Sequence, residues 1–175
     1  MNSFKDLIQQ RRSMRKFTQQ PLAADDVAII MRAALMSPSS KGKRSPEYVL
    51  VDDKAKLEQL SRCKAHGGEF LSECSLAVVI AASPEVSDAW IEDCSVAATQ
   101  IMLQAEDLNI GSCWVQTRNR MDAEGRDTEQ NVRELLGIPA DRRVLCIIAL
   151  GHKGMERKPQ NEERLLWENV HTDQW

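Results

Sequence analysis

The chain has 175 residues, 42% of them hydrophobic, which is enough for one domain that buries roughly 70% of the surface exposed by its unfolded form. Its 23 lysines and arginines nearly balance its 26 aspartates and glutamates, so the net charge of −3 gives no overall attraction to nucleic acid or to an acidic membrane. The first residues lack a signal-peptide pattern and no apolar run approaches the ~20 residues of a membrane helix, so we expect a cytoplasmic protein.

Two helices are predicted before the first strand. Ser3 followed by Asp6 is a capping signal, and apolar residues then recur at helical spacing until Arg11. The acidic residues at 25–26 suit the start of a second helix, whose apolar stripe continues to Leu35. The C-terminal end of the first helix therefore leads directly into a basic cluster that begins at Arg11.

Strands and helices alternate along the middle of the chain. Residues 47–51 are predicted to form a short strand, and a helix follows from about Asp53 to Leu60. Residues 76–82 are a continuous apolar run, which is typical of a strand covered on both faces. We expect this strand to lie in the centre of a sheet.

The second half begins with the longest predicted helix, from about residue 88 to Leu108. Its small apolar residues repeat at the helical period, which suits a domain spine or a dimer interface. A strand at 112–116, a helix at 128–136 closed by a glycine, and a buried strand at 144–150 follow. The alternation indicates an α/β or an α+β domain.

The C-terminal tail is polar from His152 until Leu165, Leu166 and Trp167, and it ends in Trp175. Apolar side chains in a polar tail are most easily explained if the tail docks on another surface, such as that of a second subunit.

Cysteines and histidines do not predict a metal centre or a disulfide framework. The five cysteines are odd in number and include no C-x-x-C pair, and the three histidines have no ligand-like spacing to Cys, Asp or Glu. We therefore expect no metal and five small buried thiols, at positions 63, 74, 94, 113 and 146.

The densest chemical feature is the segment Arg11-Arg12-Ser13-Met14-Arg15-Lys16-Phe17, with four cations and a hydroxyl inside six residues. Arginine offers a planar, permanently charged fork and serine adds a donor, which is the mixture that a phosphate group requires. A solvated basic stretch at a helix C-terminus is the simpler interpretation of these residues alone, because cations are favoured there in any case.

Two further segments could carry function. The loop Ser37-Pro38-Ser39-Ser40-Lys41-Gly42-Lys43-Arg44-Ser45-Pro46 is small, polar and basic, as functional loops and ordinary loops both are. In Gly111-Ser112-Cys113-Trp114 the glycine would let another backbone or a flat ligand approach, although a helix stop followed by a core strand explains it equally well.

Familiar catalytic motifs are missing from the sequence. It contains no G-x-S-x-G, no G-x-x-x-x-G-K-[ST] and no G-x-G-x-x-G, so a hydrolase elbow, a P-loop and a dinucleotide fingerprint lack support. Any chemistry is therefore expected to belong to a bound cofactor.

Taken in this order, these segments resemble the nitroreductase family of FMN proteins over essentially the whole chain. The basic segment 11–17 is similar to the family's R-R-S-x-R-x-[FY] motif, and residues 37–44 occupy the place of its [AS]-P-[ST]-x-x-N-x-[QR]-P-W segment. Glu92-Asp93-Cys94 opens a helix similar to the family's E-D-x-x-A-A-x-Q spine, which ends in a G-[SC]-x-W strand. Gly151-His152-Lys153 with Arg157-Lys158-Pro159 is similar to its closing G-[YH] and basic turn.

The resemblance implies an α+β fold of three layers, α/β/α, with a central, mostly antiparallel sheet flanked by helices and a long helix at a dimer interface. Residues 1–175 would form a single FMN-binding domain, and the tail from about 155 to 175 would extend over the partner subunit. The implied assembly is a homodimer with two FMN sites.

The resemblance also implies which residues bind the cofactor. The phosphate would be held by Arg11, Arg12, Ser13 and Arg15, with Arg157 or Lys158 closing the turn. The flavin ring would be contacted by Ser39, Lys41, Gly42 and Arg44 of the other subunit and by the backbone of Ser112, Cys113 and Trp114. No side chain is expected to be catalytic, because the chemistry takes place at flavin N5.

The implied activity is reduction of a small electron-poor acceptor, such as a nitro compound or a quinone, by NAD(P)H in a ping-pong cycle. A cation near the pyrimidine edge of the ring, with Lys41, Arg44 and Arg15 as candidates, would raise the reduction potential.

Two positions depart from the family pattern. Gly42 stands where the family usually has Asn, and Ser45-Pro46 stands where it usually has Pro-Trp. The substrate side of the site therefore differs from the family pattern more than the phosphate side does.

Two other classes of function remain open at this point. A flavin carrier or sensor without turnover would keep the phosphate residues and lose the nicotinamide pocket. A nucleic-acid module is less consistent with the sequence, because the positive charge is local and few aromatic residues are available for stacking.

Overall fold

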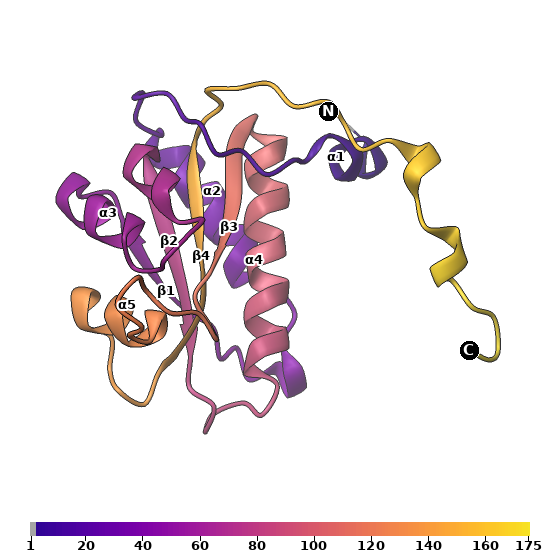
Figure 1. The fold of residues 1–175 in the computed structure, drawn as a ribbon. Helices are drawn as coiled ribbons and strands as arrows, with labels where there is room; N and C mark the ends of the chain where they lie inside the picture. The colour runs from indigo at the N-terminus through magenta and orange to yellow at the C-terminus, as the bar shows by residue number, and fades with distance from the viewer. Residues whose placement is uncertain (1–2) are drawn as a thin grey trace.

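Four antiparallel strands form the centre of the computed structural model, which describes residues 3–175 (Figure 1). The strands are β1 (Glu47–Val51), β2 (Leu76–Ala82), β3 (Ile110–Gln116) and β4 (Arg143–His152), and they lie side by side in the order β1-β2-β4-β3. The predicted apolar run 76–82 is therefore a central strand, as expected, and β3 lies at an edge.

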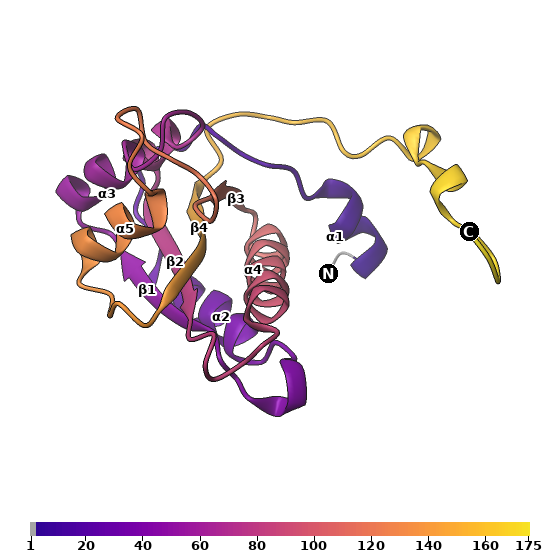
Figure 2. The same ribbon diagram turned by 60° about the horizontal axis from the view of Figure 1, so that its bottom comes forward.

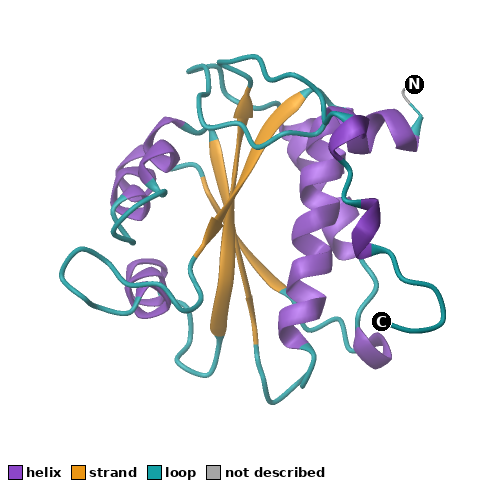
Figure 3. Cartoon of the chain, turned by 45° about the vertical axis from the view of Figure 1, so that its right-hand side comes forward, coloured by secondary structure: helices purple, strands orange, loops and turns teal. Residues whose placement is uncertain are grey.

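Helices cover both faces of this sheet, as the edge-on view in Figure 3 shows. On one face lie α2 (Ala24–Leu35) and α4 (Trp90–Asp107), and on the other lie α3 (Lys54–Ser61) and α5 (Thr128–Leu136). The expected three-layer α+β fold is confirmed.

Alternation along β2 explains why a continuous apolar sequence was needed. Val78 and Ile80 belong to the core with α2 and α4, whereas Ala77 and Val79 belong to the core with α3 and α5. Because successive side chains of a strand point to opposite faces, a strand between two helical layers has no face left for polar residues.

The predicted boundaries hold to within about two residues, and differences of two residues occur at the start of α4, at the start of β3 and at the end of β4. The sequence suggested that residues 109–111 stop the long helix, but Asn109 alone makes the reversal in a left-handed conformation (φ 56°). Ile110 already pairs with His152 of β4.

The first helix and the tail stand apart from these three layers (Figures 1 and 2). The helix α1 (Phe4–Gln10) has the predicted capping box, in which Ser3 and Asp6 each accept a hydrogen bond from the other's backbone, yet none of its residues is buried. The tail contains only two short 3-10 turns, η3 (Glu162–Arg164) and η4 (Trp167–Asn169). Large apolar side chains are exposed on both segments, at Phe4, Ile8, Leu165, Leu166, Trp167, Val170 and Trp175.

Within residues 3–175, no helix is long and apolar enough to cross a bilayer. Over the same residues, no group of three or more His, Cys, Asp or Glu side chains is placed to hold a metal ion.

Candidate functional site

The basic segment after α1 crosses one end of the sheet. Ser13 forms a parallel bridge with Ser112 of β3, and the N–H of Met14 donates to the carbonyl of Ser112 over 2.9 Å. Further along, the N–H of Thr18 donates to the carbonyl of His152 in β4 over 3.0 Å. Residues 13–18 are thus fixed by main-chain hydrogen bonds to two strands.

Three glycines make room for this crossing. A Cβ on Gly151 would come within 2.9 Å of the Phe17 ring, and one on Gly154 would come within 3.0 Å of the Phe17 backbone. A Cβ on Gly111 would meet Met14 Cβ at 3.1 Å. Gly111 therefore lets the segment that carries Met14 pass close to β3.

Three arginines gather near the buried thiol of Cys113. Burial raises the pKa of this thiol, and the positive charges of Arg15, Arg11 and Arg157, together with a hydrogen bond from Ser13, oppose that rise. These side chains come from two segments that are more than 140 residues apart in the sequence. The structure therefore brings together the predicted phosphate residues at positions 11, 13, 15 and 157.

The surroundings of the three arginines contain no anionic partner in the part of the chain that the structure describes. No ion pair of Arg11, Arg15 or Arg157 occurs within the described part of the chain, and the guanidinium of Arg15 lies 6.0 Å from the centre of the Phe70 ring in the 3-10 helix η2 (Glu69–Glu73). Like charges repel one another, so a cluster without a carboxylate suits an anion that arrives from outside.

The remaining two predicted phosphate residues are arranged differently. The guanidinium of Arg12 donates to the backbone carbonyls of Lys158 and Pro159, and the N–H of Gln160 donates to the carbonyl of Gln9 over 2.8 Å. Arg12 therefore ties the start of the tail to the end of α1. Lys158 takes part in this tie through its carbonyl, and its side chain is exposed.

The side chains of the G-S-C-W strand are divided between the two faces of the sheet. Trp114 packs on the side of α4 and its indole N–H donates to Gln116 over 2.9 Å, whereas Cys113 is buried on the opposite side. Ser112 is buried, and its carbonyl points to the open edge of β3, where it accepts from Met14. Because backbone groups alternate along a strand, those of Trp114 face the same open edge.

The other predicted contact segment lies at the far end of the molecule. Ser39 precedes the 3-10 turn η1 (Ser40–Gly42), which is attached to the first turn of α4 through Asp93. The basic end of the site adjoins the last turn of α4, where Lys153 reaches Glu106. The 13 residues from Asp93 to Glu106 span ~20 Å of helix, so one chain does not bring the two sets of predicted contacts together.

The loop has an unusual backbone. Lys41 (φ 53°), Gly42 (φ 66°) and Arg44 (φ 50°) all adopt the left-handed conformation. Glycine and asparagine are the residues that tolerate this conformation best, so Gly42 keeps the backbone shape while it lacks the side chain of the Asn that the family usually has.

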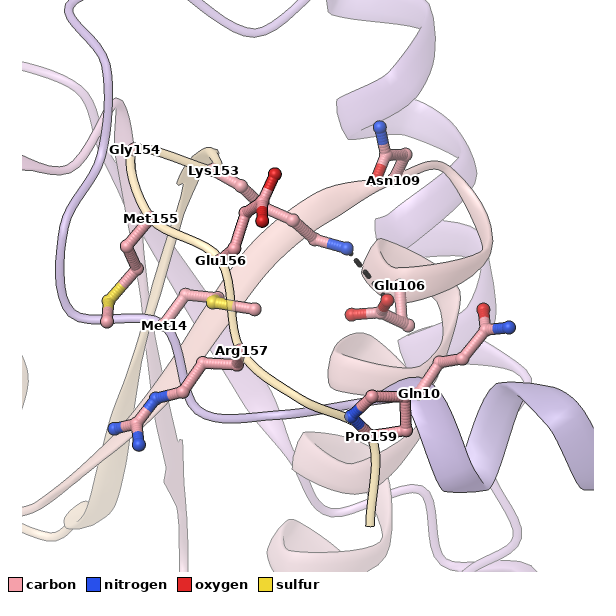
Figure 4. A pocket seen from close by; sticks show the side chains of 10 residues that line it. All are labelled: Gln10, Met14, Glu106, Asn109, Lys153, Gly154, Met155, Glu156, Arg157 and Pro159. Atoms are coloured by element: carbon pink, nitrogen blue, oxygen red, sulfur yellow. Dashed lines mark hydrogen bonds and ion pairs between the residues drawn. The ribbon is translucent and has the colours of Figure 1, made fainter.

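A partly buried ion pair beside the basic end was not predicted. Lys153 Nζ lies 2.7 Å from Glu106 Oε1, in a cavity of about 620 Å³ that is also lined by Met14 and Arg157 (Figure 4). The guanidinium of Arg157 points away from this pair in Figure 4. Sequence spacing gives no signal for a contact between residues that lie 47 positions apart.

Comparison with known proteins gives consistent matches. The sequence profile of the Nitroreductase family matches residues 8–67 and 64–152. A solved structure described as an FMN-dependent nitroreductase from Clostridium difficile R20291 is 42% identical, with a TM-score of 0.94, and the match covers 97% of this chain and 98% of that one.

Two more relatives extend these matches. A protein of Archaeoglobus fulgidus that carries the provisional name NADH dehydrogenase/NAD(P)H nitroreductase is 30% identical over 97% of each chain. An NADPH-flavin oxidoreductase of Vibrio harveyi is 27% identical over 94% of this chain and 71% of its own length.

Proposed function

This chain belongs to the nitroreductase family, and on that basis we propose that it reduces a small electron-poor acceptor, such as a nitro compound or a quinone, in a ping-pong cycle. It is a flavin oxidoreductase that uses NAD(P)H, and its cofactor is FMN.

The observation that supports the cofactor site most strongly is the cluster of Arg11, Arg15 and Arg157 around Cys113. Three permanently charged forks that have no carboxylate partner among residues 3–175 fit the phosphate of FMN in number and in charge. Ser13 adds a hydroxyl at the same place. We assign the phosphate to these four residues, and we assign to Arg12 and the backbone of Lys158 the task of fixing the turn that carries Arg157.

When bound, FMN supplies hydride transfer at N5, and the chain supplies position and charge. Beyond the bond between Ser112 and Met14, the edge of β3 offers the backbone groups of Trp114, along which the ring can lie. The buried thiol of Cys113 has a raised pKa, so it has little thiolate at neutral pH and we give it no redox role. No side chain of this chain is assigned an acid or base role.

A second copy of the chain completes the proposed site. Ser39, Lys41, Gly42 and Arg44 cannot reach the arginine cluster of their own chain along α4, so we assign their ring contacts to the partner's flavin. The cavity of about 1430 Å³ between α1, α4 and the tail is lined by the apolar side chains of Phe4, Ile8, Leu103 and Leu165 together with polar and charged side chains. We propose that a homodimer fills it and that the tail from about 155 to 175 extends over the partner.

Anaerobic mixing of the purified flavoprotein with NADH or NADPH tests the proposed activity. We expect the visible absorption of the bound flavin to bleach with at least one of the two nicotinamides, and to return on addition of a nitroaromatic compound or a quinone. Steady-state rates with both substrates varied should give the parallel lines of a ping-pong cycle.

The same experiment separates the alternative functions. A flavin that neither nicotinamide bleaches would mean a carrier or sensor, and intersecting lines would contradict the ping-pong order. A protein that binds no FMN would contradict the cofactor assignment itself.

A further inference from the structure

Asp93 is a buried carboxylate that joins separate segments of the chain. Its Oδ1 accepts the N–H of Ser40 over 2.7 Å, and its Oδ2 accepts the hydroxyls of Ser45 and Ser87, each over 3.0 Å. The residue is only 4% exposed. No ion pair of Asp93 occurs among residues 3–175, and the residue lies in the first turn of α4.

The two loop anchors of Asp93 bracket the strained part of the loop. Ser40 comes immediately before the left-handed residue Lys41, and Ser45 comes immediately after the left-handed residue Arg44. Left-handed backbone is unfavourable for residues that have a Cβ, and it persists where the surrounding structure holds it. One further contact inside the loop supports it, since the N–H of Arg44 donates to Ser39 Oγ over 2.8 Å.

The side chains between these anchors face outward. Lys41 and Arg44 are exposed, and neither forms an ion pair within the described chain. The buried carboxylate therefore fixes the backbone of a loop whose cations Lys41 and Arg44 have no ion-pair partner among residues 3–175.

We propose that Asp93 is a positioning residue that clamps Ser40 and Ser45 on one carboxylate and so holds Lys41 and Arg44 in the orientation in which they meet the flavin ring of the partner subunit. This inference rests on the proposed function, in which the loop contacts that ring. Asp93 itself touches neither substrate nor cofactor and acts through the loop.

The midpoint reduction potential of bound FMN tests this role, because a cation beside the ring stabilises the negative charge that the ring gains on reduction. We expect Lys41→Ala with Arg44→Ala to lower the potential. Asp93→Ala should lower it in the same direction and weaken FMN binding about tenfold, as the loss of one charge-assisted contact would. Asp93→Asn should have a smaller effect, because its amide oxygen can still accept the N–H of Ser40.

The combined variant and a matched control exclude a merely structural effect. In an Asp93→Ala background, the Lys41 and Arg44 substitutions should change the potential little further, since the loop is already displaced. Glu129→Gln removes a buried carboxylate that is 2% exposed and pairs with Arg143 at 2.8 and 2.9 Å in the other helical layer. It should lower the melting temperature and leave the potential unchanged.

The outcomes that overturn the proposal are distinct from those that overturn the proposed activity. An unchanged potential in Asp93→Ala, where the loop variant lowers it, contradicts the role of Asp93. An unchanged potential in the loop variant contradicts both the loop contact and Asp93, while bleaching by NAD(P)H still decides the oxidoreductase activity. If Asp93→Ala does not fold, Ser45→Ala takes its place, and a potential equal to that of the wild type overturns the inference.

Discussion

The surroundings of Arg11, Arg15 and Arg157 decide whether they are solvated surface cations or part of an anion-binding site. As part of a basic stretch after a helix, Arg11 and Arg15 are ordinary solvated cations. Beside Arg157, and without a carboxylate partner in residues 3–175, they form a cluster whose mutual repulsion an incoming phosphate would relieve.

Replacing Arg11 and Arg15 together with alanine should cost FMN several kcal/mol of binding free energy, since a hydrogen bond to a charged group contributes about 1.5 to 3 kcal/mol. Fluorescence titration of the apoprotein with FMN measures the loss. Arg142→Ala is the matched control, because Arg142 pairs with Glu47 and Asp141 far from this cluster. Equal FMN affinity in the double variant and the wild type would contradict the phosphate assignment.

Gly42 departs from the family pattern but keeps the left-handed backbone of the loop. Its φ of +66° lies in the region that both Gly and Asn tolerate, and a Cβ at this position would meet no atom within 4 Å among the described residues. The replacement of the usual Asn therefore removes a side chain from the site without altering the turn.

Residues 13–18, which follow α1, form a strap that crosses β3 and β4. Its position depends on close backbone approach, which the glycines at 111, 151 and 154 permit. Since Ser13 and Arg15 are carried by this strap, the geometry of the phosphate site depends on how closely the strap lies against the two strands.

Gly151→Ala should displace the strap. The added Cβ would lie 2.9 Å from the ring of Phe17, and overpacking of this kind costs about 1 to 3 kcal/mol of unfolding free energy. We expect urea denaturation to show that loss and FMN titration to show weaker binding.

Gly137→Ala is the control for Gly151→Ala. Gly137 ends α5 in a left-handed conformation (φ 67°) with no described atom within 4 Å of an added Cβ. Its substitution should cost about 1 to 2 kcal/mol of stability through the backbone alone and leave FMN affinity unchanged. The strap explanation is wrong if both variants bind FMN as the wild type does.

The arrangement of the whole chain separates the two halves of the proposed site. The segment after α1, which carries Arg11 and Arg15, passes near the last turn of α4, and the 39–44 loop lies at the first turn of that helix (Figure 1). A second copy in the opposite orientation would place the loop of one subunit at the cluster of the other. Exposed apolar side chains on α1 and on the tail give such a dimer its contact surface.

A mixed dimer tests this arrangement directly. One subunit carries Arg11→Ala and Arg15→Ala, and the other carries Lys41→Ala and Arg44→Ala, with different affinity tags. If each flavin takes its phosphate contacts from one subunit and its loop contacts from the other, one of the two sites has no substitution. The purified mixed dimer should then retain FMN at one site with the reduction potential of the wild type.

The result differs if both sets of contacts came from one subunit. The only intact arginine cluster would then belong to the subunit whose own loop is substituted. The retained FMN would show the lowered potential of the Lys41 and Arg44 variant. A dimer of the wild type with the Arg11 and Arg15 variant controls for the loss of one site. A monomer in sedimentation equilibrium would contradict the shared site altogether.

The sequence by itself determined the elements and the kind of cofactor. Helices and strands could be located because burial on one or two faces imposes a period on neighbouring residues, as in β2 and α4. The basic segment 11–17 could be recognised in the sequence for a similar reason, since its cations are close together in the chain.

Only the tertiary structure decided how the site is built, because its contacts join residues that are far apart. Asp93 meets Ser40 across 53 positions, Lys153 meets Glu106 across 47, and neither spacing leaves a periodic signal. Three other features likewise follow from packing. Arg12 points toward the tail, Gly111 lies close to Met14, and the loop is separated from the arginine cluster. These features depend on how the strap crosses the sheet and on which end of α4 each segment packs against, which no local pattern records.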